Sequence, residues 1–448
     1  MIIKNFSELA RSELHKLALE LVEYGLSVAD PYNAVKSSVK VLDSKIIVKG
    51  LNIDIDGRVH VIGFGKASKR MAEAIHELLG DRIAGGVVIT PSEEGYVGSI
   101  RIAKGDHPIP GKNTLQASQQ LLDYVMNNVS ENDIVITLIS GGGSALFELP
   151  EEGVSLDDIA QISRELMKRG ADIIELNAVR KRLSKVKGGK LLRFIKAKKI
   201  VSLIISDVIG DRLDTIASGP TAPDETTFLD AYNVLVKYGL WNELKESIRS
   251  MFEKGLRGEI EDTLKPGDPV FNKVLNVIIA SNKLVLEAVA QKGRELGFNT
   301  IILTSMLEGE AREVGRVLAS IIKSVHLHSV PVPKPALLLA GGETVVTVKG
   351  GGIGGRNQEL CLSLAISIRG IGKTVAVCIG SDGIDGISPA AGAIIDEQTY
   401  FEALSAHLNP IQYLNNNDSY TFFSKLNRAI ITGYTGTNVN DLFLAILI

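Results

Sequence analysis

The sequence predicts an α/β protein built from two α/β/α domains, and three observations lead to that fold class. Short apolar runs rich in β-branched residues alternate with segments of helical periodicity in both halves of the chain. Glycine turns separate many of these segments. The 448 residues are long for one domain and sufficient for two of about 200 residues each.

The first half predicts a mainly parallel, Rossmann-like sheet. Met71, Ile75 and Leu78 mark one helix face between two of its strands. A strand, a helix and a strand in this order favour a parallel sheet with helices on both faces. The expected buried strands are Val59–Phe64, Gly86–Ile89, Ile134–Ile139 and Ile200–Ile205.

The second half predicts a mixed sheet. Several of its apolar runs lie too close together for a crossover helix, so some neighbouring strands must be antiparallel. A helix is expected where Ala311, Leu318 and Val325 recur at helical spacing. The expected strands are Val277–Ala280, Thr300–Leu303, Ala336–Leu339, Val345–Val348, Thr374–Ile379, Ala429–Thr432 and Leu442–Leu447.

A less apolar stretch, from about Tyr238 to Pro269, separates the two halves and ends in clustered proline and glycine. This composition is typical of a turn or linker. We therefore expect a first domain over residues 1–260 and a second over residues 270–448. The active site is expected in the cleft between them.

The composition is ordinary for a globular protein, with 45% hydrophobic and 23% charged residues. A net charge of -3 gives no electrostatic reason to expect nucleic acid or an anionic membrane as a partner. No apolar run reaches the ~20 residues that span a bilayer, and Met1–Lys16 lacks the apolar core of a secretory signal. The two cysteines, Cys361 and Cys378, lie in apolar runs, which is typical of buried hydrophobic positions. These features favour a cytoplasmic protein.

The first candidate site is a glycine turn that follows a predicted strand and precedes a helix. It contains Gly63, Gly65 and Lys66, and exposed backbone N–H groups in such a turn favour an anion. A dinucleotide fingerprint would need a glycine at Ser68 and an acid at the end of the second strand, which instead ends at Thr90. The spacing also excludes a P-loop. A tight turn with an exposed lysine is the alternative.

The second candidate follows the strand Ile134–Ile139. Three glycines, Gly141, Gly142 and Gly143, stand between Ser140 and Ser144. Glycines let a ligand approach the backbone closely, and serine hydroxyls can donate to oxyanions. The segment lacks the last glycine of a serine-hydrolase elbow. It is the strongest single candidate for anion binding, and a glycine-rich hinge is the alternative.

The third candidate is the basic segment from Asn177 to Lys190. Asn177 is a plausible N-cap and Gly188 a plausible C-cap. Arg180, Ser184 and Lys187 would then share one helix face. Such a face is either solvated or forms a cationic wall that neutralises phosphate or carboxylate.

Carboxylates follow two further predicted strands. Asp207 comes directly after Ile200–Ile205, where Mg²⁺ could be held beside anion-binding loops, and Asp211 would only shape the turn. Asp382 and Asp385 follow Thr374–Ile379, without the glutamate of a calcium loop. Helix or turn capping is the alternative for each carboxylate.

The fifth candidate is the segment Gly350–Gly355, in which five of six residues are glycine. This segment, which ends in Gly355, places Arg356 and Asn357 at the start of a helix that begins near Gln358. An arginine there suits bidentate binding of phosphate or carboxylate. His107, in a proline turn, fits a structural role better than that of a general base.

These loops together fit an enzyme that acts on small anions. Phosphoryl transfer needs cations that offset the charge of the moving group and Mg²⁺ that bridges nucleotide phosphates, with little covalent chemistry from the protein. Lys66 and Arg356 are expected on facing loops. The inventory of glycine loops, cations and carboxylates matches that need.

The chain resembles the glycerate 2-kinase family along nearly its whole length, with the motifs in the family's order. The likeness lies in Gly-Phe-Gly-Lys66-Ala, Ser140-Gly-Gly-Gly-Ser, Asn177-Ala-Val-Arg-Lys, Ser206-Asp-Val-Ile-Gly-Asp and Ala217-Ser-Gly-Pro-Thr221. The later Gly-Gly-Arg356-Asn-Gln-Glu, Gly-Ser-Asp382-Gly-Ile-Asp-Gly and Gly436-Thr-Asn-Val-Asn-Asp441 resemble its C-terminal domain, called MOFRL.

The resemblance implies transfer of the γ-phosphoryl group of ATP to the 2-hydroxyl of D-glycerate, giving 2-phosphoglycerate, with Mg²⁺. It places the catalytic lysine and arginine on Lys66 and Arg356. Asp207 and Asp382 are the two candidate metal ligands. The assembly is expected to be a monomer or a homodimer. An NAD(P)H-dependent hydroxypyruvate reductase is the first alternative, and the absent ribose acid argues against it. A non-catalytic protein that binds sugar acids or nucleotides is the second.

Overall fold

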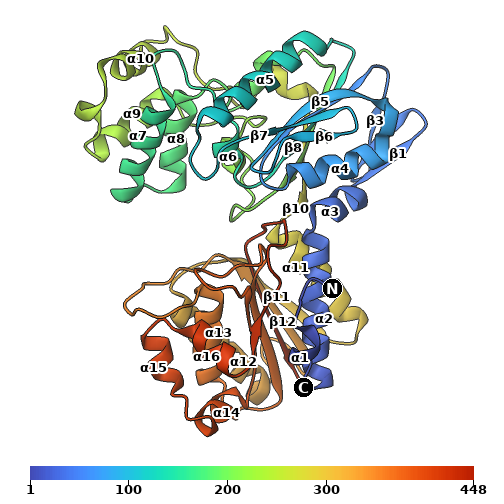
Figure 1. Cartoon of the computed structure of the whole chain (residues 1–448), viewed down its shortest axis with the longest axis vertical. Helices are drawn as coiled ribbons and strands as arrows, with labels where there is room; N and C mark the ends of the chain where they lie inside the picture. Colours follow the sequence, from blue (N-terminus) through green and yellow to red (C-terminus); the bar gives the residue numbers. More distant parts are fainter. The chain divides into compact units, whose positions relative to one another are not determined.

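The computed structural model describes all 448 residues, which form two compact units (Figure 1). The central unit comprises Pro31–Ile279, and the terminal unit combines Met1–Asp30 with Ala280–Ile448. This division differs from the expected domains 1–260 and 270–448, because the first 30 residues belong with the C-terminal half. Their helix α2 (Glu13–Ala29) buries its apolar face in the terminal unit, where Gly25 lies against Val285 and Val289.

The central unit contains a seven-stranded sheet of order β10-β9-β8-β4-β5-β7-β6. The five strands β9, β8, β4, β5 and β7 are mutually parallel, and β6 is antiparallel to β7. This confirms the predicted Rossmann-like, mainly parallel sheet. The strands are β4 (Val59–Phe64), β5 (Ile83–Thr90), β6 (Gly95–Val97), β7 (Ile100–Lys104), β8 (Ile134–Ile139), β9 (Lys199–Ile205) and β10 (Val274–Ala280).

Helices cover both faces of this sheet, so β4 and β8 are buried throughout. Helix α4 (Ser68–Leu79) packs on β4, β5 and β8, while α5 (Lys112–Asn128) packs on β5 and β7 (Figure 1). Helix α3 (Pro31–Ser38) lies against α4 and leads into a separate antiparallel sheet. Its strands are β1 (Val39–Leu42), β2 (Lys45–Val48) and β3 (Leu51–Asp54).

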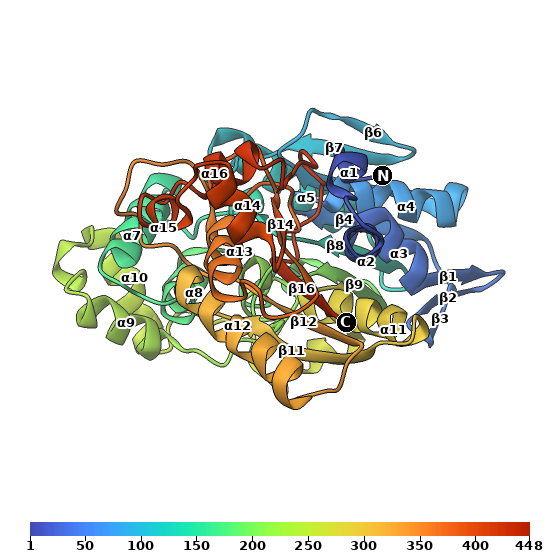
Figure 2. The same cartoon turned by 90° about the horizontal axis from the view of Figure 1, so that it is seen from below.

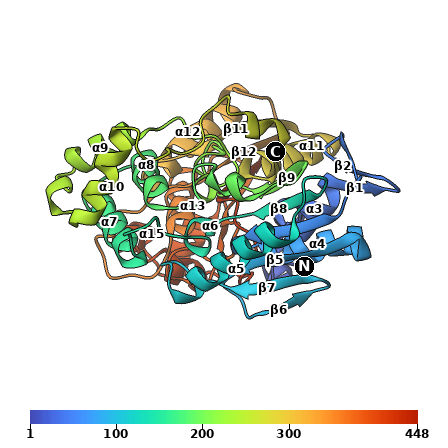
Figure 3. The same cartoon turned by 90° about the horizontal axis from the view of Figure 1, so that it is seen from above.

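Four helices gather beside the sheet of the central unit and have a core of their own (Figure 3). Three of them begin with capping boxes, in which Ser155, Asp172 and Thr227 accept from backbone N–H groups one turn into the helix. The helices are α7 (Leu156–Lys168), α8 (Ile173–Leu183), α9 (Phe228–Lys237) and α10 (Glu246–Leu256); the short α6 (Gly143–Leu146) precedes them.

The terminal unit contains a six-stranded sheet of order β11-β12-β16-β13-β14-β15. Only β11 and β12 are parallel, which confirms the predicted mixed sheet. The expected strand Val345–Val348 is wrong: its only pairing is a bridge from Val345 to Glu310, and Val348 is 71% exposed. The strands are β11 (Asn299–Leu307), β12 (Ala336–Gly342), β13 (Thr374–Gly380), β14 (Gly392–Asp396), β15 (Ala429–Ile430) and β16 (Asp441–Leu447).

Helices again cover both faces of the terminal sheet (Figure 2). Helices α2 and α11 (Asn282–Glu295) pack on one face, while α12 (Ala311–His328) and α13 (Arg356–Ser367) pack together over the other. Successive residues of β12 point to opposite faces, and Leu338 belongs to the core under α12 and α13. The remaining helices are α1 (Phe6–Leu9), α14 (Thr399–Ser405), α15 (Pro410–Asn415) and α16 (Ser419–Lys425).

None of these helices combines the length and the hydropathy needed to cross a bilayer.

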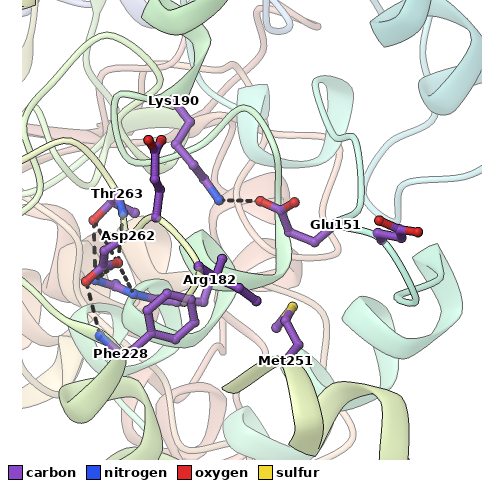
Figure 4. A pocket seen from close by; sticks show the side chains of 10 residues that line it. Glu151, Arg182, Lys190, Phe228, Met251, Asp262 and Thr263 are labelled. Atoms are coloured by element: carbon purple, nitrogen blue, oxygen red, sulfur yellow. Dashed lines mark hydrogen bonds and ion pairs between the residues drawn. The ribbon is translucent and has the colours of Figure 1, made fainter. Parts of the chain in front are cut away.

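Most of the basic segment 177–190 is buried, with Arg180 half-buried and only Lys185 exposed, so its interpretation as a solvated helix face is wrong. The expected caps are also wrong, because α8 begins after Asp172 and ends at Leu183. Lys181 and Arg182 are each 1% exposed and share Asp224, at 2.9 and 3.0 Å, and Asp224 is itself fully buried. Arg182 also pairs with Asp262 (Figure 4). Because their partners are distant in sequence, these charges link α8 to the segment that precedes α9 and to the segment that follows α10.

The Asp224→Ala substitution tests this network. It leaves two buried cations without their carboxylate, so we expect the free energy of unfolding to fall by about 3–5 kcal/mol. Trp241, the single tryptophan of the chain, reports urea unfolding of the central unit. Glu259→Ala is the control, since Glu259 pairs with Arg257 on the surface and its loss should be undetectable. Equal stability of the two variants would contradict the account.

Candidate functional site

The candidate loops of the central unit lie at one edge of its parallel sheet. Lys66 follows β4, the segment Ser140–Gly143 follows β8, and Asp207 follows β9. Because β4, β8 and β9 are adjacent and parallel, their carboxyl ends meet at this edge. The fold therefore brings together three segments that are about 70 residues apart in the chain.

The first two glycine loops interlock. The backbone N–H of Lys66 donates to the carbonyl oxygen of Gly141 at 2.9 Å, and the N–H of Ala67 donates to Ser140 Oγ at 3.0 Å. Gly65 has a φ of 135°, and a Cβ added there would lie 2.2 Å from Ser140 Oγ. Only glycine fits this position. Ser140 thus holds the two loops together and is itself 1% exposed.

Lys66 projects from the interlocked loops. Its side chain is exposed and makes no ion pair within the central unit. A Cβ added to Gly142 would lie 3.2 Å from Lys66 Cε and 3.0 Å from His107 Nε2, so both side chains flank this glycine. Gly63 lies inside β4, opposite Leu138 of β8, and its role there is packing. The lysine is therefore free to meet an anion.

Lys187 stabilises the segment that follows the Ser140–Gly143 loop. Its Nζ donates to the carbonyl oxygens of Ser144 at 2.9 Å and Phe147 at 3.0 Å, and it pairs with Glu148 Oε2 at 2.8 Å. These contacts use all three ammonium protons. Burial lowers the pKa of Lys187, and Glu148 opposes that change. Lys187, which was expected to bind phosphate, is therefore a buried lysine whose contacts are made within the protein.

Arg180 and Ser144 remain closer to solvent. Arg180 Nε donates to Ser163 Oγ at 2.9 Å, and no hydrogen bond to its terminal nitrogens forms within the central unit. Burial lowers the pKa of Arg180, and the charge of Glu148 opposes the change. The guanidinium remains charged, because arginine does not lose its proton in proteins. It can therefore pair with a carboxylate or phosphate.

The turn at Ala217 and Ser218 is strained and contacts Ser144. Ser144 Oγ and Ser218 Oγ are 2.9 Å apart, and Ser218 Oγ donates to Asn177 Oδ1 at 3.0 Å. Ala217 and Ser218 have φ values of 50° and 61°, a conformation that costs about 1–3 kcal/mol per residue. The Gly188 N–H holds the Ser218 carbonyl oxygen at 3.0 Å. Such strain concentrates at functional sites.

A second candidate group lies in the terminal unit around Arg356, the first residue of α13. Arg356 donates to both oxygens of Asp441, from Nε at 2.6 Å and from Nη2 at 3.1 Å. Its Nη1 donates to Glu343 at 2.7 Å. Glu343 follows β12 and Asp441 begins β16, so adjacent strands fix the guanidinium, which is 34% exposed.

Asp385 fixes the start of α13. Its carboxylate accepts from the backbone N–H groups of Asn357 at 3.0 Å and Gln358 at 2.8 Å. Asn357 Nδ2 also donates to Asp441 Oδ1 at 2.9 Å. A Cβ on Gly355 would lie 2.3 Å from the Asp385 backbone, which excludes other residues there. Gly355 and Asn357 therefore help to orient Arg356.

Burial raises the pKa of Asp441 to about 6, against the attraction of Arg356. The same pair raises the pKa of Arg356, because the charges of Asp441 and Glu343 outweigh its burial. Arg356 is therefore always cationic, and the charge of its principal partner depends on pH.

The two metal candidates lie in different units. A Cβ added to Gly141 would lie 2.1 Å from Asp207 Oδ2, so this carboxylate reaches the glycine loop of the central unit. Asp382 Oδ1 accepts from the N–H of Ile384 at 3.2 Å, which is a turn-shaping contact in the terminal unit. No group of three or more histidine, cysteine, aspartate or glutamate side chains gathers as a metal cage.

A cavity of about 210 Å³ in the central unit is lined by Arg182 and Lys190 of the basic segment but by no residue of the glycine loops (Figure 4). Arg182 and Lys190 line it, but both are paired, Lys190 with Glu151 at 2.8 Å. No predicted site residue lines this cavity.

Sequence reasoning missed the carboxylates that orient the cations. Glu148, Glu343 and Asp441 carry no local signal of that role, because their partners are set by the fold. Asp441 is the last residue of the Gly436–Asp441 motif, and this family motif was the only feature of the sequence that drew attention to it.

Two family profiles match the chain. Residues 17–253 match a domain of unknown function, DUF4147, and residues 336–441 match the MOFRL family. The two matches define a DUF4147–MOFRL protein with an α/β fold.

Relatives of similar length extend these matches. A glycerate 2-kinase from Pyrococcus horikoshii is 44% identical, with 97% of this chain and 98% of that protein covered. A D-glycerate 2-kinase from Thermotoga maritima is 44% identical, with 97% and 99% covered. The crystal structure of a glycerate kinase from Thermotoga maritima matches with a TM-score of 0.87 over 97% of this chain and 99% of that chain. This chain belongs to the glycerate 2-kinase family.

Two relatives from Agrobacterium vitis carry a different name, putative hydroxypyruvate reductase. One of them is 39% identical, with 91% of both chains covered.

The Gly65→Ala substitution tests the interlock. The added methyl group would overlap Ser140 at a backbone conformation that disfavours alanine, so we expect the central unit to lose about 2–4 kcal/mol of unfolding free energy. Gly50→Ala is the matched control: its φ is 86° and no atom lies within 4 Å of the added Cβ, so only about 1 kcal/mol of strain is expected. Urea unfolding followed by Trp241 fluorescence measures both, and similar losses would count against the interlock.

Proposed function

We propose that this chain is a glycerate 2-kinase, which transfers the γ-phosphoryl group of ATP to the 2-hydroxyl of D-glycerate and releases 2-phosphoglycerate and ADP. The observation that carries the proposal is the 44% identity over nearly the full length to relatives named glycerate 2-kinase. The charged groups of the two candidate sites agree with this chemistry.

Phosphoryl transfer requires fixed cations near the moving group. In the central unit, Lys66 stands exposed on the interlocked loops, with Arg180 as a second cation. We assign Lys66 to the transferred phosphoryl group and Arg180, with Ser144, to the carboxylate or phosphate of a substrate. Fixed loops suit this task, because preorganised donors need no rearrangement during the reaction.

In the terminal unit, Arg356 supplies a cation that Asp441 and Glu343 orient. We propose that Lys66 and Arg356 act on the same phosphoryl group. The support for this arrangement is the family resemblance and the placement of each cation at the end of a sheet.

Mg²⁺ would neutralise and bridge the phosphates of ATP. Asp207 fits as its protein ligand, because its carboxylate reaches the Gly141 loop and Mg²⁺ prefers carboxylate oxygen beside phosphate and water. Asp382 is the second candidate, although its Oδ1 already accepts a backbone N–H.

We further propose that the protein works in the cytoplasm as a monomer or homodimer, with D-glycerate and ATP as its small-molecule partners. Neither nucleic acid nor a membrane is expected among them.

The test is formation of 2-phosphoglycerate from ATP, Mg²⁺ and D-glycerate, detected by its consumption by enolase. Lys66→Ala and Arg356→Ala should each lower kcat by about 10²- to 10³-fold, because each removes a charge that stabilises the transition state. Lys196→Ala, which removes an exposed lysine outside these loops, should leave kcat unchanged. A product that enolase cannot use would overturn the 2-position assignment.

The Agrobacterium relative's name motivates a second candidate, a hydroxypyruvate reductase. It predicts oxidation of NADH or NADPH by hydroxypyruvate, and a flat absorbance trace at saturating cofactor dismisses it. β5 ends in Thr90 and not in an acid, which argues against a nicotinamide ribose there. Ligand binding without turnover of any donor would instead favour a non-catalytic binding protein.

A further inference from the structure

We propose that His107 is a catalytic residue whose imidazole accepts the proton of the attacking hydroxyl group. The inference rests on the proposed kinase function. In this step the hydroxyl oxygen of the hydroxy acid bonds to the γ-phosphorus of ATP, and the bond from that phosphorus to the bridging oxygen breaks. The electron pair of the broken bond leaves on ADP, while the hydroxyl proton passes to His107 and then to water.

The position of His107 carries the proposal. It follows β7, yet its ring reaches the glycine loop after β8: a Cβ on Gly142 would lie 3.0 Å from both Nε2 and Cδ2 of the imidazole. The same point lies 3.2 Å from Lys66 Cε. The imidazole and the lysine therefore border one stretch of open backbone, where a substrate could contact both.

The turn that carries His107 is fixed. The neighbouring Asp106 accepts from the backbone N–H groups of Asn113 at 2.9 Å and Thr114 at 3.1 Å, which ties the turn to the start of α5. Thr114 Oγ1 accepts from the Asp106 N–H at 2.9 Å and lies 3.2 Å from the carbonyl oxygen of Ala145 in α6. The turn is thus connected to the helix that follows the glycine loop, and a fixed base needs such support.

The imidazole ring of His107 has no hydrogen-bond partner within the central unit. No hydrogen bond to either imidazole nitrogen forms within the central unit, although the ring is half-buried. A histidine that serves only the turn would be expected to bond to it. The carboxylates with buried positions in the two candidate sites are occupied: Glu148 pairs with Lys187, and Asp441 pairs with Arg356.

The surroundings keep the imidazole neutral. Burial lowers the pKa of His107, and the positive charge of Lys66 lowers it further. The charged groups around it are Lys66 from the loop after β4, Asp106 from its own turn, and Asp207, whose carboxylate approaches Gly141. The Asp106 carboxylate faces α5, so the positive charge of Lys66 has the larger effect on the pKa of His107. A neutral imidazole at pH 7 can accept a proton.

The test compares pH–rate profiles of kcat/KM for D-glycerate in the wild-type protein and in His107→Gln. The wild type should lose activity below an apparent pKa under the usual 6.5 of histidine, because protonation removes the base. His107→Gln should lower kcat by about 10²-fold, remove this acidic limb, and change KM little. His328→Gln, at an exposed position that ends α12, is the matched control and should keep the wild-type profile.

A second variant guards against a folding defect. In His107→Ala, added imidazole should restore part of kcat, a rescue that no structural role predicts. A His107→Gln protein with wild-type kcat and an intact acidic limb would overturn the inference, as would absence of rescue in a folded His107→Ala protein. Wild-type protein that forms no product would instead overturn the kinase proposal itself, so the two failures are distinguishable.

Discussion

The interlock between two glycine loops is the constraint on which the central site depends. The Lys66 and Ala67 N–H groups bond to the segment after β8, and Gly65 passes so close to Ser140 that no side chain fits between them. Parallel strands bring the loops to one edge, but these contacts decide where Lys66 stands. A lysine on a free loop would lose conformational entropy on binding an anion, and this one is already positioned.

Ion pairs hold the charged groups and segments of both sites in place. Lys187 and Glu148 hold the segment that carries Ser144, and Asp441 holds Arg356 on two nitrogens. Removing one partner from such a pair leaves an uncompensated charge, so these carboxylates matter as much as the cations they orient. The chain therefore uses many charges as scaffold and leaves few, notably Lys66 and Arg180, toward solvent.

The sequence predicted the two sheets well, because continuous apolar runs such as Ile134–Ile139 mark strands buried on both faces. It also located the glycine loops, since close backbone approach requires glycine. The burial of Arg182 and Lys187 could not be predicted, because Asp224 and Glu148 meet them only in the folded chain. Likewise, chain order hides the packing of α2 with the C-terminal half. The roles of individual site residues and the cleft between the units stay predictions.

The central claim is that substrate anions bind where Lys66 stands on the interlocked loops. A crystal structure with D-glycerate and a non-hydrolysable ATP analogue tests it most directly. The account predicts a phosphate or carboxylate oxygen of the bound ligands within hydrogen-bond distance of Lys66 Nζ, with the Gly65–Ser140 contact unchanged. Ligands bound only elsewhere, for example in the cavity beside Lys190, with Lys66 still exposed to water, would contradict it.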